Sequence, residues 1–263
     1  MKYFVVDAFT SAVFKGNPAG VCLLEHAISE ELMQNIAAEN HLSETAFLVP
    51  AEGGYDLRWF TPEVEVDLCG HATLASAFVV RNFVDMHADK MDFFTQSGTL
   101  SVAYQDGLFK MDFPSRPPQP IDMITEFKHS VGCDLLEAHL SRDLLLLVKD
   151  EAAVRNIHPN FDAMRKVKDG FGLIVTAQGD DVDFVSRFFV PKAGVREDPV
   201  TGSAHSTLIP FWSKRLGKQE MVAQQLSQRG GTLYCQNRGE RVQIAGHAAL
   251  YLIGEIHVGD LPE

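Results

Sequence analysis

Residues suited to chemistry gather at two turns of the chain that share one pattern. The first turn starts at Arg58 and reads R-W-F-T-P-E-V-E-V-D-L-C-G-H-A-T, and the second starts at Arg187 and reads R-F-F-V-P-K-A-G-V-R-E-D-P-V-T-G-S-A-H. In each, a glycine (Gly70 or Gly202) opens an apolar segment of helical type. Because a helix N-terminus presents unpaired N–H groups and a partial positive charge, it can bind a carboxylate or a phosphate. One such turn could simply begin a packed helix, but two in matching positions predict a site for a small anion.

Three titratable side chains accompany the first turn. Cys69 directly precedes the helix, where a thiol can be acidified to act as a base or nucleophile, or can simply be packed. His71 lies in the first helical turn, which should lower its pKa and leave a neutral imidazole. Glu44 stands in the segment H-L-S-E-T-A-F. Its carboxyl group could shuttle protons from an apolar pocket, where burial raises a pKa, or could be a surface group at a helix end.

Asp198 is the titratable candidate at the second turn. It precedes Pro199, and Asp67 occupies a similar place in the first turn. Aspartate is common in turns because its side chain bonds the nearby backbone. Either aspartate could therefore be structural.

The elements that must hold these residues can be predicted from local patterns. Ser29, followed by two glutamates, is typical of a helix N-cap. The segment after Gly70 and the segment from about 203 to 215 are apolar nearly all round, as buried helices are. A further helix is expected at 160–168. Strands are expected near 2–9, 21–24, 45–49, 55–60, 93–95, 100–104, 108–113, 143–148, 172–176, 184–189, 222–227, 231–236, 241–244 and 247–257.

The strands come in runs, with one long buried helix in each half of the chain. This order favours an α+β fold, a sheet wrapped around a central helix, over an alternating βαβ sheet. Gly70 and Gly202 lie 202 − 70 = 132 residues apart, about half of 263, so a whole domain is expected to be duplicated. The proline-rich segment 114–120 predicts a linker, because prolines do not fit inside a sheet. The expected domains are 1–116 and 117–263, with the last strand free to return to the first domain.

Composition and motifs exclude several classes of function. The net charge of −12 argues against a nucleic-acid partner, and the longest apolar run, 248–253, is strand-sized rather than membrane-spanning. The four cysteines show no metal-ligand or redox spacing, so no metal is expected, and reduced thiols in a cytoplasmic protein are the default. Dinucleotide, Walker, serine-hydrolase and zinc-protease motifs are missing. No cofactor is therefore expected.

Several segments together resemble the phenazine-biosynthesis PhzF-like proteins, relatives of diaminopimelate epimerase. The matching segments are D-A-F-T (7–10), F-K-G-N-P-A-G (14–20), S-E-T-A-F (43–47), F-T-P (60–62), D-L-C-G-H-A-T-L-A (67–75) and E-D-P-V-T-G-S-A-H (197–205). The resemblance implies two similar domains, each a β-barrel-like sheet around a central helix, with the active site in the cleft between them. It also implies cofactor-independent acid/base chemistry on a small anionic, carboxylate-bearing substrate, and often a homodimer.

The resemblance further implies roles for single residues. Glu44 matches the glutamate that moves a proton between carbons of an unsaturated amino acid in the phenazine enzyme. His71 and Asp198 would position or polarise the substrate. The implied substrate-binding residues are Asn17, Cys69, Gly70, Thr201, Gly202 and Ser203.

One position departs from the epimerases, which use two cysteines on opposite faces of the substrate carbon. Cys69 matches the first, but Thr201 stands at the second, and a threonine hydroxyl is a poor partner for two-base racemisation because its pKa lies far above that of a thiol. Our hypothesis is therefore a cytoplasmic, homodimeric isomerase with Glu44 as general acid/base. Two alternatives remain: a cysteine-dependent epimerase or dehydratase that uses Cys69, and a non-catalytic or interaction protein that keeps the fold.

Overall fold

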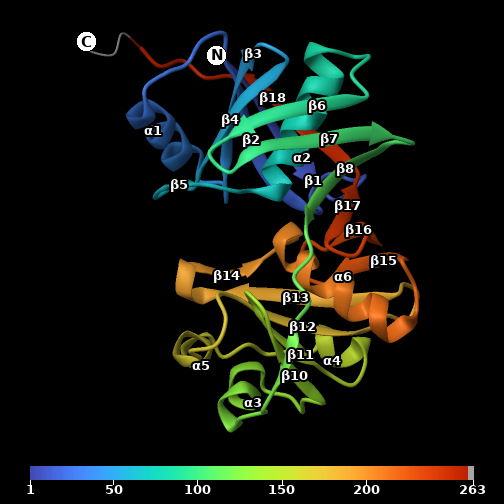
Figure 1. Cartoon of the computed structure of the whole chain (residues 1–263). Helices are drawn as coiled ribbons and strands as arrows, with labels where there is room; N and C mark the ends of the chain where they lie inside the picture. The colour runs from blue at the N-terminus through green and yellow to red at the C-terminus, as the bar shows by residue number, and fades with distance from the viewer. Residues whose placement is uncertain (260–263) are drawn as a thin grey trace. The chain divides into compact units, whose positions relative to one another are not determined.

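The computed structural model describes residues 1–259 and divides them into two compact units (Figure 1). The first unit is Met1–Met111 together with the segment that begins at Gly246, and the second is Asp112–Ala245. The division lies a few residues before the boundary expected at 116, and the last strand belongs to the first unit.

The first unit contains a sheet and two α-helices. The helices are α1 (Glu30–Asn40) and α2 (Gly70–Val79), and a π-helical turn, η1 (Val80–Val84), continues α2. The strands are β1 (Lys2–Ala8), β2 (Asn17–Leu23), β3 (Thr45–Ala51), β4 (Gly54–Phe60), β5 (Glu65–Val66), β6 (Lys90–Thr95), β7 (Gly98–Gln105), β8 (Leu108–Pro114), which runs across the division, and β18 (Ala248–Glu255).

The second unit repeats this plan with more short helices. Its helices are α3 (Thr125–Val131), α4 (Glu151–Arg155), α5 (Phe161–Lys166), the 3-10 turn η2 (Pro191–Ala193) and α6 (Gly202–Leu216). Its strands are β9 (Gln119–Ile121), β10 (Glu137–Leu140), β11 (Leu144–Leu147), β12 (Leu173–Gln178), β13 (Phe184–Val190), β14 (Val195–Asp198), β15 (Glu220–Gln225), β16 (Gly231–Asn237) and β17 (Arg241–Gly246).

The two units have the same strand order and the same strand directions. In the first unit, neighbouring strands pair in the order β18-β1-β2-β3-β4-β6-β7-β8. In the second unit, the order is β9-β10-β11-β12-β13-β15-β16-β17. The third and fifth pairs of each series are parallel and the others antiparallel, and short β5 and β14 pair with β4 and β13. This correspondence confirms the duplication that the repeated turn predicts.

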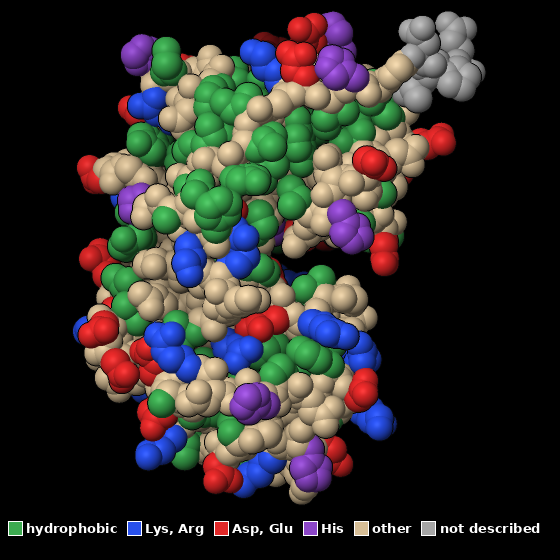
Figure 2. Space-filling view, turned by 180° about the vertical axis from the view of Figure 1, so that it is seen from behind, with side chains coloured by type: hydrophobic (Ala, Val, Ile, Leu, Met, Phe, Trp, Pro, Cys, Tyr) green, Lys and Arg blue, Asp and Glu red, His purple; other side chains and the backbone are tan. Residues whose placement is uncertain are grey.

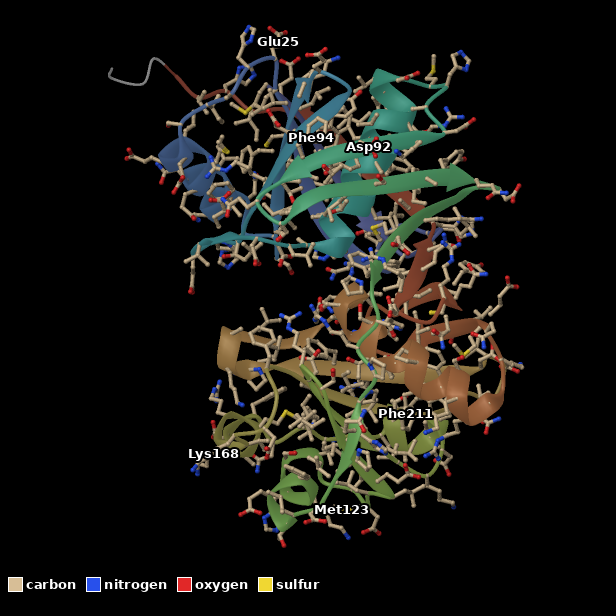
Figure 3. All side chains as sticks on the ribbon, viewed as in Figure 1. Glu25, Asp92, Phe94, Met123, Lys168 and Phe211 are labelled. Atoms are coloured by element: carbon tan, nitrogen blue, oxygen red, sulfur yellow. The ribbon has the colours of Figure 1, made fainter. Side chains whose placement is uncertain are left out.

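The long helix of each unit is buried, as its apolar sequence predicts. In the first unit, this helix is α2, which η1 extends to Val84. It packs against β1, β2 and β3, and its residues from His71 to Ala77 are all buried (Figure 1). In α6, the ring of Trp212 stacks on Phe184 with 5.8 Å between centroids, and Phe211, labelled in Figure 3, lies edge-on to it. Burying aromatic side chains of this size is a main source of stability. The α+β architecture expected from the strand runs is confirmed.

Two local expectations had different outcomes. Ser29 caps α1 as predicted, since its side chain accepts a hydrogen bond from the backbone N–H of Leu32. The expectation that the prolines of 114–120 stay outside a sheet is wrong. Pro114 ends β8, and Pro120 lies in β9 opposite His139. Proline is tolerated at strand ends and in outer strands because no ladder donor is needed there.

The surface of the first unit carries exposed hydrophobic side chains, among them Phe14, Tyr251 and Ile253. Figure 2 shows hydrophobic side chains gathering on one face of that unit. Among residues 1–259, no helix is both long and apolar enough to cross a membrane.

Candidate active site

Glu44, Cys69 and His71 come together in the first unit although they lie on two separate segments. Glu44 directly precedes β3, and its carbonyl oxygen accepts a hydrogen bond from the N–H of Gly20 on the parallel neighbour β2. Cys69 is the N-cap of α2, and His71 is its second residue. Glu44 Oε2 lies 3.1 Å from His71 Nε2, and Cys69 Sγ lies 3.5 Å from His71 Nδ1. His71 thus links the other two groups.

The surroundings change the expected ionisation of two of these groups. Burial alone would lower the pKa of His71, but the nearby Cys69 and Glu44 outweigh it and raise this pKa well above its usual value. The pKa of the Cys69 thiol is also raised, first by burial and then by the Glu44 carboxylate. The expectations of a neutral imidazole and an acidified thiol are therefore wrong. Cys69 and the Glu44 carboxylate therefore both favour the protonated form of the His71 ring.

The same three side chains offer metal-ligand atoms within 4.8 Å of one another. The sulfur of Cys69 faces one nitrogen of the His71 ring, and the carboxylate of Glu44 faces the other. A single ion binds an imidazole through only one of its nitrogens. As they lie, the three side chains do not form the ligand set of one ion.

The two long helices start without a side-chain cap. Ser29, Asp150 and Asn160 cap their helices by accepting a hydrogen bond from a backbone N–H. The N-cap residues Cys69 and Thr201 make no such bond. The first-turn N–H groups of α2 and α6 therefore receive no bond from the N-cap side chain, a condition that an anion-binding helix end must meet.

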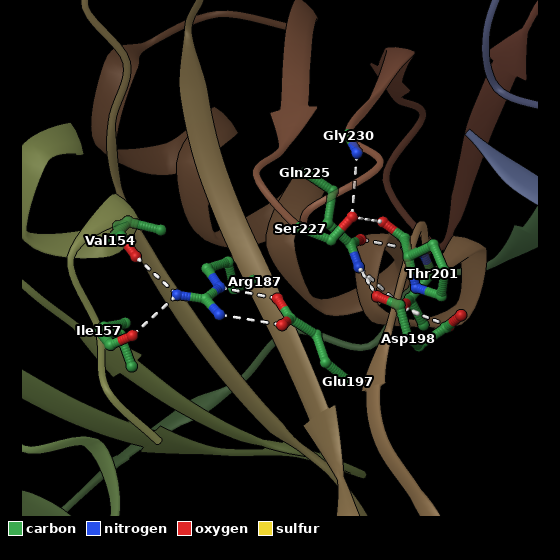
Figure 4. Close-up of polar contacts among 10 residues, drawn as sticks. Val154, Ile157, Arg187, Glu197, Asp198, Thr201, Gln225, Ser227 and Gly230 are labelled. Atoms are coloured by element: carbon green, nitrogen blue, oxygen red, sulfur yellow. Dashed lines mark hydrogen bonds and ion pairs between the residues drawn. The ribbon is translucent and has the colours of Figure 1, made fainter. Parts of the chain in front are cut away.

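The turn before α6 holds the second group of candidates, Asp198 and Thr201 (Figure 4). The hydroxyl of Thr201 donates to Asp198 Oδ2 at 2.5 Å, and its backbone N–H donates to Gln225 Oε1 at 2.9 Å. His205, one helical turn further on, directs Nδ1 at the carbonyl oxygen of Thr201 at 2.8 Å. Gly202 is buried and Ser203 is half-buried in the first turn of α6.

Register corrects one correspondence between the two turns. Val66 pairs with Trp59, and Asp198 pairs with Phe188 in the equivalent strand. The counterpart of Asp198 is therefore Val66, and Asp67 corresponds to Pro199. The expected likeness of Asp67 and Asp198 is wrong by one residue. Thr201 does correspond to Cys69, since each is the N-cap of its helix.

Sequence reasoning missed the ion pair that supports each turn. Arg58 binds both carboxylate oxygens of Glu65, at 2.6 and 2.7 Å, and Arg187 binds Glu197 in the same way at 2.7 and 2.9 Å (Figure 4). Two-bond pairs of this kind hold strands β4 and β13 to the short strands β5 and β14. The signal was present, because an arginine opens each motif and a glutamate stands five residues before each glycine.

Asn17 lies on β2, the strand that pairs with β3 and packs against α2. It is the first residue of β2, is fully buried, and pairs with Ala8 of β1. Glu44 has no acidic counterpart in the second unit: Gly20 pairs with Thr45 and Leu144 pairs with Leu173, so the matching residue is Gly172. The acid/base cluster therefore belongs to the first unit alone.

These features define a duplicated α+β protein in which one half carries a carboxylate–imidazole–thiol cluster at a helix N-terminus. The family model described as phenazine biosynthesis-like protein, PhzC-PhzF, matches residues 6–254. The chain therefore belongs to the phenazine biosynthesis-like family.

Individual relatives agree with this assignment. A Pseudomonas aeruginosa protein named as an uncharacterized isomerase is 47% identical over 259 residues, which cover 98% of this chain and 99% of the relative. A crystal structure of a PhzF-family protein from Enterococcus faecalis has a TM-score of 0.97 at 49% identity and covers 98% and 99% of the two chains. The structure of a predicted epimerase from Pseudomonas aeruginosa, at 22% identity, has a TM-score of 0.76 over 98% and 99% of the chains and shows the shared epimerase-like fold. The expected family and fold are confirmed, whereas the site between the domains, the homodimer and the cytoplasmic location stay predictions.

Proposed function

We propose that this protein is a cofactor-independent isomerase that moves a proton between carbons of a small, carboxylate-bearing substrate, with Glu44 as general acid/base. One observation carries the proposal: the Glu44 carboxylate lies 3.1 Å from a buried His71 beside the uncapped start of α2. The Glu44 side chain keeps 20% of its surface exposed, so a substrate atom can reach it. A relative that is 47% identical is named as an isomerase, which supports the reaction class.

The reaction requires one base that becomes an acid. The Glu44 carboxylate takes a proton from a carbon next to a carboxylate or within an allylic system, so that a C–H bond breaks and an O–H bond forms. The electron pair shifts through the conjugated system of the substrate. The carboxylic acid then returns the proton to another carbon, which completes the isomerisation without a net change in atoms or electrons. Positioned proton transfer of this kind contributes about 10²–10⁴-fold to rate.

Neighbouring groups stabilise the charges that this reaction develops. Protonated His71 holds the Glu44 carboxylate in place, with His71 Nε2 3.1 Å from Glu44 Oε2. The N–H groups at Gly70 and in the first turn of α2 bind the negative charge of the substrate. In the second unit, we assign substrate contacts to Asp198 and to the first turn of α6, which includes Ser203.

The cysteine-dependent alternative has less support. A thiolate base at Cys69 would need a lowered pKa, but burial raises it. A second acid or base would be needed at Thr201, whose hydroxyl donates to Asp198 and accepts from Gln225 Nε2 at 3.1 Å. Two-base epimerisation is therefore disfavoured, because the Cys69 thiol has a raised pKa and the Thr201 hydroxyl is already hydrogen-bonded to Asp198 and Gln225.

Proton exchange in deuterated water tests the proposal. The protein would be mixed with a panel of small amino acids, hydroxy acids and unsaturated amino acids, and deuterium entering a carbon position would be read by NMR. The key variant is Glu44→Gln, and Glu39→Gln is the matched control because Glu39 is an exposed glutamate of α1 in the same unit. We expect exchange in the wild type and in Glu39→Gln, and a loss of at least about 100-fold in Glu44→Gln.

Three results would count against this function. Full exchange in a folded Glu44→Gln protein would remove Glu44 as the acid/base. Loss of exchange in Cys69→Ala together with full exchange in Glu44→Gln would favour the cysteine-dependent reaction. Binding of a panel compound without exchange, measured by calorimetry, would favour a non-catalytic protein.

A further inference from the structure

Gln225 is a buried polar residue that the sequence motifs do not include. It is the last residue of β15 and is 1% exposed. Its side chain makes three hydrogen bonds to the turn before α6 (Figure 4). Oε1 accepts from the N–H of Thr201 at 2.9 Å, and Nε2 donates to the carbonyl oxygen of Asp198 at 2.7 Å and to Thr201 Oγ1 at 3.1 Å.

These bonds fix which atom donates and which accepts in a short relay, the chain of hydrogen bonds from Gln225 through the Thr201 hydroxyl to Asp198. The Thr201 N–H can only donate, so the Gln225 amide must present its oxygen there and its NH₂ group to the other side. The NH₂ group can only donate, so Thr201 Oγ1 must accept from it. The proton of the hydroxyl is then directed at Asp198 Oδ2, 2.5 Å away. Gln225 thereby sets which oxygen of this chain donates and which accepts.

The first unit lacks this device although it shares the rest of the turn. Ser97 donates to the carbonyl oxygen of Asp67 at 2.8 Å, and Ser227 donates to that of Pro199 at the same distance. The strand register makes Thr95 the counterpart of Gln225. The glutamine thus occurs in the half that has an aspartate at the position of Asp198, where the first unit has Val66, whereas the serine-to-carbonyl bond is common to both halves.

We propose that Gln225 is a positioning residue that holds Asp198 and Thr201 in the one arrangement the reaction uses. This role rests on the proposed function, in which Asp198 contacts the substrate. Gln225 acts through Thr201 and Asp198 and does not touch the substrate, because its side chain is buried and its amide is fully engaged. It also explains why a threonine stands at the N-cap of α6: its hydroxyl passes a hydrogen bond on to the carboxylate.

Three variants separate the parts of this role. Gln225→Leu removes all three bonds. Gln225→Glu, as a carboxylate, can still accept from the Thr201 N–H but cannot donate to Oγ1, so the relay loses its direction. Gln224→Leu is the matched control, because Gln224 is the neighbouring, half-buried glutamine of β15 and points to the opposite side of the strand.

The first measurement does not depend on activity. Protein labelled with ¹⁵N-threonine would report hydrogen exchange at the amide of Thr201. We expect protection in the wild type, in Gln224→Leu and in Gln225→Glu, and faster exchange by at least about tenfold in Gln225→Leu, the change for a lost bond of about 1.4 kcal/mol. Unchanged protection in Gln225→Leu would overturn the assigned geometry.

The second measurement uses the deuterium exchange reaction with the substrate found for the wild type. We expect kcat to fall by about 10- to 100-fold in Gln225→Leu and in Gln225→Glu, with a smaller change in KM, because misplaced groups lose transition-state contacts. In an Asp198→Asn background, the same Gln225 substitutions should lower kcat by less than about threefold, since the effects of substituting residues that act as one unit are not additive. If Gln225 only stabilises the fold, its substitution would lower kcat by the same factor in both backgrounds.

Distinct outcomes overturn the two proposals. Full activity in folded Gln225→Glu, or additive losses with Asp198→Asn, would refute the positioning role. Absence of exchange in the wild type would refute the proposed function instead, and the amide of Thr201 would still decide whether Gln225 sets the geometry of the turn.

Discussion

Lowering the pH from 7 to 4 should destabilise the second unit through His205. This side chain is fully buried in α6, and its Nδ1 lies 2.8 Å from the carbonyl oxygen of Thr201, to which the neutral ring donates. Burial lowers the pKa of His205 to about 4, and the bond to Thr201 only partly offsets this. The equivalent residue of α2 is Thr73, whose hydroxyl donates to the carbonyl oxygen of Cys69 at 2.6 Å. The substitution His205→Thr therefore keeps the hydrogen bond and removes the titration.

The magnitude follows from the difference in pKa between the folded and unfolded chain. The folded pKa of about 4 lies about 2.5 below the usual 6.5, which corresponds to about 3.5 kcal/mol in total at about 1.4 kcal/mol per pKa unit. Because the folded pKa is the lower one, this stability is complete above pH 6.5 and is lost as the pH falls towards 4. About 2 kcal/mol of it should already be lost at pH 5.

Urea unfolding at a series of pH values measures this loss. The chain contains two tryptophans, and Trp212 of α6 reports on the second unit once Trp59 is replaced by phenylalanine. Trp59→Phe is the parent in this comparison, so any cost of that replacement is common to both proteins and cancels in the difference. Between pH 7 and 4, the parent should lose about 3 kcal/mol more of its free energy of unfolding than the His205→Thr variant loses. Groups that titrate in both proteins cancel in this difference.

A difference that stays constant across this pH range would refute the reasoning. It would mean that His205 has the same pKa in the folded and unfolded chains, and therefore that water or another donor reaches its ring. A constant penalty for His205→Thr at every pH is expected in addition, because a smaller side chain leaves space in the core.

Three further predictions follow from the described contacts. Iodoacetamide at pH 7.5 should alkylate half-buried Cys133 well before Cys69, because Cys69 is buried from the reagent while the pKa of both thiols is raised, and peptide mass spectrometry would show the order; rapid labelling of Cys69 would contradict this. Arg187→Lys should lower the free energy of unfolding by about 1–3 kcal/mol because the two-bond pair is lost, whereas Arg165→Lys, at the exposed pair with Asp162, should change it by less than about 0.5 kcal/mol. Gly16→Ala should destabilise by more than about 1 kcal/mol in thermal unfolding, since its φ is +65° and a Cβ would lie 2.1 Å from a backbone oxygen; an unchanged Tm would refute this.

Local patterns were sufficient for much of the fold. The cap at Ser29, the buried helix after Gly70 and the runs of strands follow from residue types and spacing within one element. The short helices α3 and α4 were not predicted, because their stability comes from packing rather than from a long amphipathic pattern. Pro120 was misplaced for a similar reason, since only the pairing of β9 with β10 shows that it lies in an outer strand.

The sequence by itself determined that two halves repeat one glycine turn with Cys69 and His71 beside it, since these are statements about neighbours along the chain. Glu44 was indicated by the resemblance of S-E-T-A-F (43–47) to the PhzF-like proteins. Only the tertiary structure decided the direction in which the pKa values of Cys69 and His71 move. The Glu44 carboxylate reaches His71 from another segment and raises a pKa that the helix end alone would lower.

The tertiary structure also decided that Val66, and not Asp67, corresponds to Asp198, and that Gln225 reaches across 24 residues to hold Thr201. The physical reason is common to all these cases. Charge interactions and hydrogen bonds depend on distances of a few ångströms, and residues far apart in sequence come within that distance only when the sheet register and helix packing are set.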